Sequence, residues 1–210
     1  GDQRPAGIFV GLGTRVANTD RNMTQGSPIN TGRDLDVFID GEGFFKVDII
    51  DREGSGIGFT RSGNFFANSE GELVLGNSDG PRLVPPLAIP ADTMSVTITN
   101  DGHVMATVAG DPTPQDIGQI ELANFINANG LRPIGGNIFV ETAASGPAIE
   151  GAPGEGAIGT LEQGFLESSN VDPVNELIGL IQAQRGFELN SQVIQAADQT
   201  LQVVSNLRRF

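Results

Sequence analysis

The chain has 210 residues, of which 26 are acidic and 12 basic, so its formal net charge at pH 7 is −14. This length fits one large domain, or one domain with an appendage. The negative field repels phosphate backbones and anionic lipids, which argues against a nucleic-acid partner. No apolar run approaches the roughly 18–20 residues that cross a bilayer, so we expect no direct membrane insertion.

The sequence contains 29 glycines and 12 prolines but no cysteine. Without cysteine the fold has neither disulfides nor thiolate metal ligands, so packing and hydrogen bonds must hold it together. The glycines and prolines follow no collagen period and therefore predict many turns between short strands. Residues 1–13 show no basic region followed by an apolar stretch, so we expect no cleaved secretory signal.

Three regions of the chain differ in residue pattern. Residues 1–33 are rich in turn-forming residues and are interpreted as an extended N-terminal segment, with one short strand at residues 8–10. Residues 34–168 predict a β-rich domain, and residues 169–210 predict a C-terminal helix for assembly. The predicted fold class is therefore α+β, a mainly antiparallel β domain with a long C-terminal helix of coiled-coil type.

The β-rich region opens with residues 34–40, in which polar and apolar side chains alternate as in a half-buried strand. This pattern places Asp34, Asp36 and Asp40 on the wet face. A calcium site built from them is disfavoured, because the spacing of an EF-hand loop and its bidentate glutamate are absent. After a glycine-rich turn, a second strand is expected at residues 44–50.

Hairpins are expected at residues 65–75 and 95–108. The turn of the second contains Asp-Gly, which supplies the positive φ that tight hairpin turns need. Further strands are expected at residues 118–125 and 137–142. Residues 143–159 are small and rich in glycine, proline and alanine, and are interpreted as a mobile loop.

The pattern changes at Asp172, a good helix N-cap that is followed by Pro173 at the first helical position. From there to about Leu207 no further proline occurs, and the only glycines are Gly179 and Gly186. The predicted helix has about 35 residues and is roughly 50 Å long, far above the globular mean of about 11–12 residues.

Apolar side chains recur along this helix in an a/d pattern held over about four heptads. A strand of ordinary size covers only about 17–20 Å, so packing on the same chain's β domain, which is the alternative, would leave much of the helix uncovered. We therefore predict that a partner helix from outside this sequence covers the seam. The predicted assembly residues are Leu177, Leu180, Ile181, Ala183, Phe187, Asn190, Ile194, Ala197, Leu201 and Val204.

The opposite side of the predicted helix is rich in amides and poor in charge. A freely solvated helix usually shows Glu–Lys pairs four residues apart, whereas uncharged amides are buried against neighbours at lower cost. This pattern indicates neighbours on several sides, with an ordinary solvent-exposed face as the alternative. The amide residues are Gln182, Gln184, Gln192, Gln195, Gln199, Gln202 and Asn206.

No pattern in the sequence predicts catalysis, and we assign no catalytic, cofactor-binding or metal-binding residue. Residues 76–80 match G-x-S-x-G around Ser78, but that motif needs a helix after its turn and Pro81 follows here. A hydrolase using Ser78, or a pair of catalytic carboxylates, is the disfavoured alternative. His103 is the only histidine and is expected to be exposed after a hairpin turn.

Four stretches resemble elements of the bacterial flagellar rod and hook proteins. Residues 170–191 resemble the C-terminal signature of that family, residues 40–47 its GxGFFxV element and residues 59–65 its (Y/F)TRxGxF element. Residues 88–102 resemble its IPxxA…DG segment, and order and spacing agree over nearly the whole chain. The motif residues are Gly41, Gly43, Phe44, Phe45, Thr60, Arg61, Gly63, Asn170, Val171, Gln184 and Arg185.

The resemblance implies a structural subunit of the periplasm-spanning flagellar basal-body rod that polymerises helically into a hollow drive shaft, transmits torque and passes export cargo. The short β region and the approach to the helix at residues 164–170 are most similar to distal rod proteins. The implied partners are copies of itself, other rod proteins, hook protein and the surrounding ring proteins, without a cofactor. Family members begin with a long helix that pairs with the last one, and we expect that helix, which this sequence does not include, to be the missing partner.

The alternative is an extracytoplasmic β-rich module that binds carbohydrate or peptidoglycan and carries a coiled-coil tether. That alternative predicts a saturable ligand and a small oligomer instead of open-ended filaments.

Overall fold

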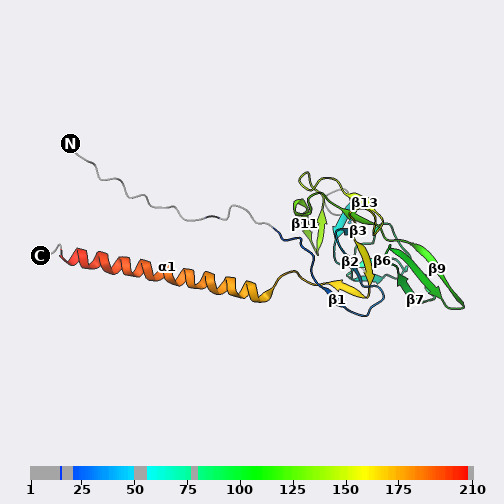
Figure 1. The fold of residues 1–210 in the computed structure, drawn as a ribbon, viewed down its shortest axis with the longest axis horizontal. Helices are drawn as coiled ribbons and strands as arrows, with labels where there is room; N and C mark the ends of the chain where they lie inside the picture. The colour runs from blue at the N-terminus through cyan, green and yellow to red at the C-terminus, as the bar shows by residue number, and fades with distance from the viewer. Residues whose placement is uncertain (1–14, 16–20, 50–55, 77–79, 208–210) are drawn as a thin grey trace. The chain divides into compact units, whose positions relative to one another are not determined.

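A computed structural model describes residues 15, 21–49, 56–76 and 80–207 (Figure 1). The expected strand at residues 8–10, Ser78 and the side chain of Val204 lie outside the described residues. The chain divides into two compact units, Gly1–Glu167 and Ser168–Phe210. The first consists of antiparallel strands and the second contains one long helix, which confirms the α+β class. The coiled-coil character of the helix and the boundaries at residues 33 and 168 stay predictions.

Within the described residues, the first unit contains fifteen short strands and one 3₁₀ helix, as the many glycines and prolines predicted. They are β1 (Pro28–Asn30), β2 (Val37–Asp40), β3 (Phe44–Asp48), β4 (Ile57–Thr60), β5 (Phe65–Ala67), β6 (Leu73–Leu75), β7 (Thr93–Ile98), β8 (His103–Val108), β9 (Asp111–Gln119), β10 (Leu122–Asn124), η1 (Ala128–Gly130), β11 (Arg132–Gly135), β12 (Ile138–Val140), β13 (Ile149–Gly151), β14 (Thr160–Gln163) and β15 (Phe165–Glu167).

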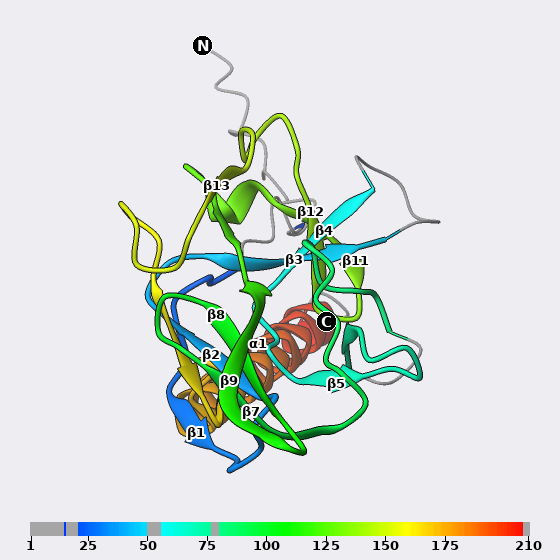
Figure 2. The same cartoon turned by 90° about the vertical axis from the view of Figure 1, so that its right-hand side faces the viewer.

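The strands pair into one larger sheet and several smaller ones. The larger sheet has the order β11-β12-β4-β3-β10-β13, and a three-stranded sheet has the order β7-β8-β9 (Figure 2). Two-stranded ribbons join β1 to β15, β2 to β14 and β5 to β6. Because β14 and β15 come from the end of the unit and pair with β2 and β1 from its beginning, the two ends of this unit meet.

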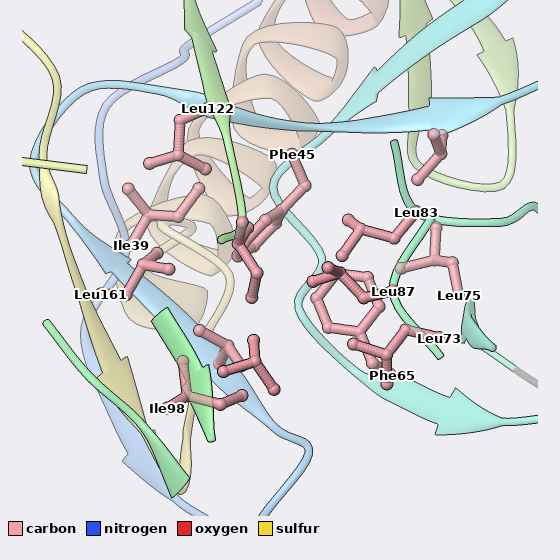
Figure 3. Close-up of a cluster of buried hydrophobic side chains, with 14 of the residues drawn as sticks. Ile39, Phe45, Phe65, Leu73, Leu75, Leu83, Leu87, Ile98, Leu122 and Leu161 are labelled. Carbon is pink, nitrogen blue, oxygen red and sulfur yellow. The ribbon is translucent and has the colours of Figure 1, made fainter. Parts of the chain in front are cut away.

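The main core packs side chains from the larger sheet, the three-stranded sheet and the β2–β14 and β5–β6 ribbons (Figure 3). Phe45 of β3 and Phe65 of β5 are fully buried and meet edge to face, with ring centroids 5.1 Å apart. Leu122 of β10 and Leu161 of β14 are buried in the same cluster. Such an edge-to-face contact between aromatic rings stabilises the fold beyond the contribution of the buried apolar area alone.

A second, smaller cluster covers the other face of the large sheet. Phe44 and Phe45 are neighbours in β3, and successive side chains of a strand point to opposite faces. Phe44 accordingly packs edge to face against Phe125, with ring centroids 5.9 Å apart, and Phe59 packs on Phe125 at 4.8 Å. The large sheet is therefore buried on both faces around β3.

The helix of the second unit, α1 (Pro173–Leu207), begins where the sequence predicted. Asp172 Oδ1 accepts a hydrogen bond from the backbone N–H of Val174 at 2.9 Å, and the Asp172 carbonyl accepts one from Glu176 N–H at 3.1 Å. The first bond satisfies a donor that the first helical turn leaves unpaired, and the second is the first backbone bond of the helix. Both predicted hairpins are also present, as β5–β6 and β7–β8.

The predicted wet face of residues 34–40 is wrong at Asp36, whose side chain is only 1% exposed. Asp36 Oδ2 accepts a hydrogen bond from Thr31 Oγ1 at 2.6 Å, and its Oδ1 lies 3.3 Å from Nη1 of Arg33. The neighbouring residues Val37, Phe38 and Ile39 are all buried, because β2 is covered on both faces. The alternation of polar and apolar residues in this stretch therefore does not correspond to one solvent-exposed face of a strand.

Two further predictions in this unit are wrong. Residues 118–125 are not one strand, because the chain leaves β9 at Gln119 and enters the large sheet as β10. Residues 143–159 are not a strandless loop, because β13 lies among them and pairs with β10 as the edge strand of that sheet. Small residues conceal such pairing, since their burial leaves little periodic signal in the sequence.

Lys46 of β3 is the only lysine of the chain, and its side chain is 3% exposed. Its ammonium group donates hydrogen bonds to Glu121 Oε2 at 2.7 Å and to Glu150 Oε2 at 2.9 Å. Burial lowers the pKa of Lys46, but the hydrogen bonds and negative charges of the two glutamates outweigh burial and raise that pKa above its ordinary value of 10.5. This cluster ties the central strand to the edge strand β13.

The chain offers a clean test of this cluster, because it has no tyrosine and no cysteine to titrate between about pH 9 and 12. A pKa raised by folding means that the stabilisation is complete below the unfolded-state pKa of about 10.5 and is lost as pH rises through the folded-state pKa. We predict that the free energy of unfolding in urea falls at alkaline pH, and that it falls less in Lys46→Met. Equal slopes against pH in both proteins would contradict the assignment.

Candidate assembly surfaces

Arg61 connects the glycine turn between β2 and β3 to the end of β15. Its Nη1 and Nη2 donate hydrogen bonds to the carbonyl oxygens of Gly43 (3.0 Å) and Gly41 (3.1 Å), and its Nε donates to Glu167 Oε2 at 2.7 Å. The side chains of Arg61 and Glu167 are 18% and 15% exposed, so solvent screens their ion pair weakly. A guanidinium suits this position because its planar fork serves several acceptors at once.

The segment before β1 reaches the same place. Gln25 Nε2 donates a hydrogen bond to the Ile39 carbonyl at 2.8 Å, and Gln25 Oε1 accepts one from Gly41 N–H at 3.2 Å. Glu167 Oε1 accepts a hydrogen bond from Gly26 N–H at 2.8 Å. The segment just before β1 and the end of β15 are thus fixed at one point. We call this group of residues the clasp: Gln25, Gly26, Gly41, Gly43, Arg61 and Glu167.

The glycines of the motif are required by backbone geometry. Gly41 and Gly43 have φ of +116° and +144°, a region that residues with a side chain rarely adopt. Gly63 is required for a different reason, since a Cβ at this position would lie 1.7 Å from the Val37 carbonyl oxygen. The backbones approach closely because Val37 N–H donates a hydrogen bond to the Gly63 carbonyl at 3.0 Å.

The structure brings seven of the predicted motif residues together on β3, β4 and their turns. Phe45 and Thr60 face each other across these two strands and are both fully buried. The remaining motif residues, Asn170, Val171, Gln184 and Arg185, belong to the second unit. Gln25 and Glu167 were missed as parts of the site. The sequence did contain an indication of Glu167, because it is the only acidic residue in the stretch 164–170 that leads to the helix.

Helix α1 exposes its large apolar side chains. Phe187, Ile194 and Leu201 of the predicted seam are 77%, 63% and 66% exposed, and Ala183, Asn190 and Ala197 between them are exposed as well. The eleven exposed large apolar residues of the helix are Val174, Leu177, Ile178, Leu180, Ile181, Phe187, Leu189, Val193, Ile194, Leu201 and Val203. Surfaces of this kind mark sites of association.

The described part of the chain shows neither of two other kinds of site. Its helices include none that is long and apolar enough to span a membrane. Its histidine, aspartate and glutamate side chains form no group of three or more that could hold a metal ion. His103 Nδ1 lies 3.1 Å from Asp116 Oδ2, and the His103 side chain is 38% exposed.

A β unit with two closed cores, joined to a long helix that exposes its apolar residues, defines a class of structural subunit that is completed by assembly. Comparison with known families agrees. Residues 38–106 match the family model described as "Flagellar hook protein FlgE/F/G D1 domain", and residues 162–207 match "Flagellar basal body rod FlgEFG protein C-terminal".

Curated relatives match over nearly the whole chain. The flagellar basal-body rod protein FlgG of Caulobacter vibrioides is 44% identical over 204 residues, which are 97% of this chain and 76% of the relative. FlgG of Borreliella burgdorferi is 41% identical over 98% of this chain and 77% of the relative. The hook protein FlgE of Escherichia coli is 44% identical over 119 residues, which are 57% of this chain and 29% of the relative.

The chain therefore belongs to the family of the flagellar basal-body rod protein FlgG. It is a structural subunit of the basal-body rod, which is also where it is located, and the resemblance to distal rod proteins is confirmed. The predicted assembly residues of α1 stay predictions, since none of these comparisons tests single residues.

Replacing Arg61 tests the clasp. Arg61→Ala leaves Glu167 without its cation and removes the Arg61 hydrogen bonds to the Gly41 and Gly43 carbonyls, so we predict a loss of about 2–4 kcal/mol of unfolding free energy. Arg82→Ala is the matched control, because Arg82 is 49% exposed and its ion pairs are worth about 1 kcal/mol or less. Urea unfolding followed by NMR of core methyl groups measures both. Equal losses in the two variants would contradict the role of Arg61.

Replacing Gly63 tests the close backbone approach. The added methyl of Gly63→Ala must displace the Val37 carbonyl, so we predict a loss of about 2–3 kcal/mol in the same urea measurement, or failure to fold. Gly179→Ala is the control, because a Cβ at that position meets nothing within 4 Å and alanine favours the helix by about 1 kcal/mol. A Gly63→Ala protein as stable as this control would refute the close-packing argument.

Proposed function

We propose that the chain polymerises helically with copies of itself, through α1, into a hollow rod that transmits torque and lets export cargo pass. The observation that carries this proposal is the exposure of eleven large apolar side chains along one 35-residue helix. Complete burial of each stabilises by about 1.5–3 kcal/mol, which gives an upper bound of roughly 16–33 kcal/mol for the helix. An assembled state is favoured by an energy of this size.

The partner of the seam in this proposal is another helix. Interaxial distances of 8–10 Å between packed helices require apolar side chains at regular spacing, which Leu180, Phe187 and Ile194 supply every seven residues. The family resemblance indicates that the first helix of rod and hook proteins takes this position. The clasp then fixes the point at which the β unit is joined to the assembled helices.

The other partners follow from the family. We propose that neighbouring rod proteins and hook protein contact the two ends of the polymer, and that ring proteins surround it. The match of 119 residues to a hook protein supports a shared mode of packing between rod and hook subunits. The amide-rich side of α1, with Gln192, Gln195 and Gln199, supports a wall with few fixed charges on which unfolded cargo does not bind strongly.

We propose a structural role without catalytic turnover. The family is one of structural flagellar proteins, which supports this proposal. The clasp and the Lys46 cluster are both sets of hydrogen-bonded charged groups. Each connects strands of the β unit, so a role in stabilising the fold accounts for both. A rod subunit needs no cofactor, because assembly is driven by burial of apolar surface.

Filament formation tests the proposed function. The chain is produced with the N-terminal helix of the Caulobacter vibrioides relative joined ahead of Gly1, and filaments are counted by electron microscopy. We predict filaments from this protein and none from Ile194→Lys, which places a charge in the seam. Gln195→Lys, one residue farther along on the amide-rich side, is the matched control and keeps filaments.

The result that would contradict the proposal is the absence of filaments from the parent protein at any concentration at which it remains soluble. Filaments from Ile194→Lys as abundant as from Gln195→Lys would show that the seam does not carry the assembly.

A further inference from the structure

The β unit exposes two large apolar side chains outside its two closed clusters. Among the described residues of this unit, Ile126 is 83% exposed and Met94 is 76% exposed, more than any other large apolar side chain. Scattered apolar residues on a surface are normal and need no partner. These two differ from scattered residues, because Ile126 lies on a turn and Met94 borders a groove.

The groove lies along β7, and we call it the β7 groove. It has a volume of about 470 Å³ and is lined by β7 and by the turn between β5 and β6. Its apolar lining includes Leu35, Ile89, Met94 and Val96. A volume in the range of ordinary ligand pockets, about 300–1,000 Å³, admits a large aliphatic side chain.

One end of β7 is already covered by the chain itself. β7 is an outer strand of its sheet, and the side chain of Gln163 binds its free edge. Gln163 Nε2 donates a hydrogen bond to the Val96 carbonyl at 2.8 Å, and Gln163 Oε1 accepts one from Ile98 N–H at 3.2 Å. A partner in the groove therefore contacts the other end of β7, where Met94 lies.

Ile126 belongs to the connection at residues 125–131, which we call the β10–β11 turn. Phe125 and Leu131, at its two ends, are buried in the second cluster. Gly130 N–H donates a hydrogen bond to the Asn127 carbonyl at 3.1 Å, and Asn127 Nδ2 donates one to the Ala144 carbonyl at 3.1 Å. The turn is thus fixed in the single subunit, so binding through Ile126 costs little ordering of the backbone.

The turn and the groove lie on opposite faces of the large sheet. Leu35, Ile89 and Val96 of the groove pack against the main core, whereas Phe125 and Leu131 of the turn belong to the second cluster on the other face. Figure 2 shows β7 near the bottom and β13, the partner strand of β10, near the top. Ile126 therefore cannot enter the β7 groove of its own chain.

The charges of the two surfaces are complementary. Two chains that each carry −14 repel, so contact is favoured where a basic surface of one meets an acidic surface of the other. Residues 122–140 contain no acidic residue, and their one charged residue is the exposed Arg132, next to the turn. The residues that line the groove include Asp34 and Glu70 but no basic residue. Arg82 approaches Glu70 at 3.9 Å without lining the groove.

Symmetry makes such a contact suitable for a polymer. Two different surfaces on opposite faces of one unit form a heterologous contact, which repeats from copy to copy. A contact between two identical turns would instead be isologous and would close into a dimer. This step rests on the proposed function.

We propose that Ile126 of one copy inserts into the β7 groove of a second copy, beside Met94, with Arg132 of the first copy next to Asp34 of the second. Each β unit then gives its turn to one neighbour and receives the turn of another in its groove. This contact belongs to the β unit and is separate from the contacts of α1.

Disulfide cross-linking tests this contact cleanly, because the chain has no cysteine of its own. The protein used is the filament-forming one with the added N-terminal helix, carrying Met94→Cys and Ile126→Cys together. Disulfides form between residues whose Cα atoms lie about 4.4–6.8 Å apart, so only a close contact is trapped. Mild oxidation should give a ladder of covalent multimers that a reducing agent dissolves.

The matched control combines Met94→Cys with Ile29→Cys. Ile29 is another large apolar residue of the β unit, 54% exposed on β1, and this pair should give no ladder. Each single variant, Met94→Cys or Ile126→Cys, should stay monomeric on a denaturing gel, and a mixture of the two should stop at dimers.

A charge exchange tests the proposed neighbour of Arg132. Arg132→Glu, added to the double cysteine protein, should slow the formation of the ladder by up to roughly fivefold, the effect of one exposed ion pair. Adding Asp34→Arg as well should restore the rate, because the pair is then present with its charges reversed. A rate that Arg132→Glu leaves unchanged, or that Asp34→Arg does not restore, would overturn this pairing.

Three outcomes would overturn the contact itself. Dimers from Ile126→Cys alone would mean that two turns meet, and a monomer with an internal disulfide would mean that the turn reaches its own groove. Filaments of the double variant without a ladder would mean that something else covers the groove. A ladder without filaments from the cysteine-free parent would support this contact and count against the proposed function, and absence of both would reject both.

Discussion

The exposed apolar side chains of α1 set the constraint on which the rest of the molecule depends. A helix of 35 residues carries eleven large apolar side chains in contact with solvent, while the β unit keeps its own apolar residues in two closed clusters. The β unit is thus complete in itself, and the helix is not. The proposed assembly explains this contrast, because the apolar side chains of the helix would be buried against neighbouring chains.

The clasp fixes the end of β15, where the β unit ends. Residues of the clasp come from the segment before β1, from the turn before β3, from the end of β4 and from β15, which immediately precedes the second unit. Arg61 serves acceptors on two of these segments, and the glycines allow the backbone to approach it. The seven motif residues on β3, β4 and their turns are therefore folding elements of the β unit. They hold Glu167, the last residue of the β unit, in place.

Local features of the sequence predicted much of this fold. The cap at Asp172 and the Asp-Gly turn at residues 101–102 act through near neighbours in the chain, so the start of α1 and the β7–β8 hairpin were predicted correctly. The burial of Asp36 and the pairing of β13 depend on partners far away in sequence, and local periodicity does not report them. The same holds for the clasp, in which Gly26 bonds to Glu167 across 141 positions. The apolar periodicity of α1 was visible in the sequence, whereas the exposure of its apolar side chains required the structure.

The central claim is that α1 gains its protection from other chains, and amide hydrogen exchange along residues 174–203 tests it most directly. The same protein is measured once dispersed at low concentration and once assembled into filaments. The account predicts rapid exchange of these amides in the dispersed protein and strong protection in the filaments, while the core strands β3 and β4 are protected in both. Strong protection of α1 in the dispersed single chain would contradict it, because the helix would then be sheltered without any neighbour.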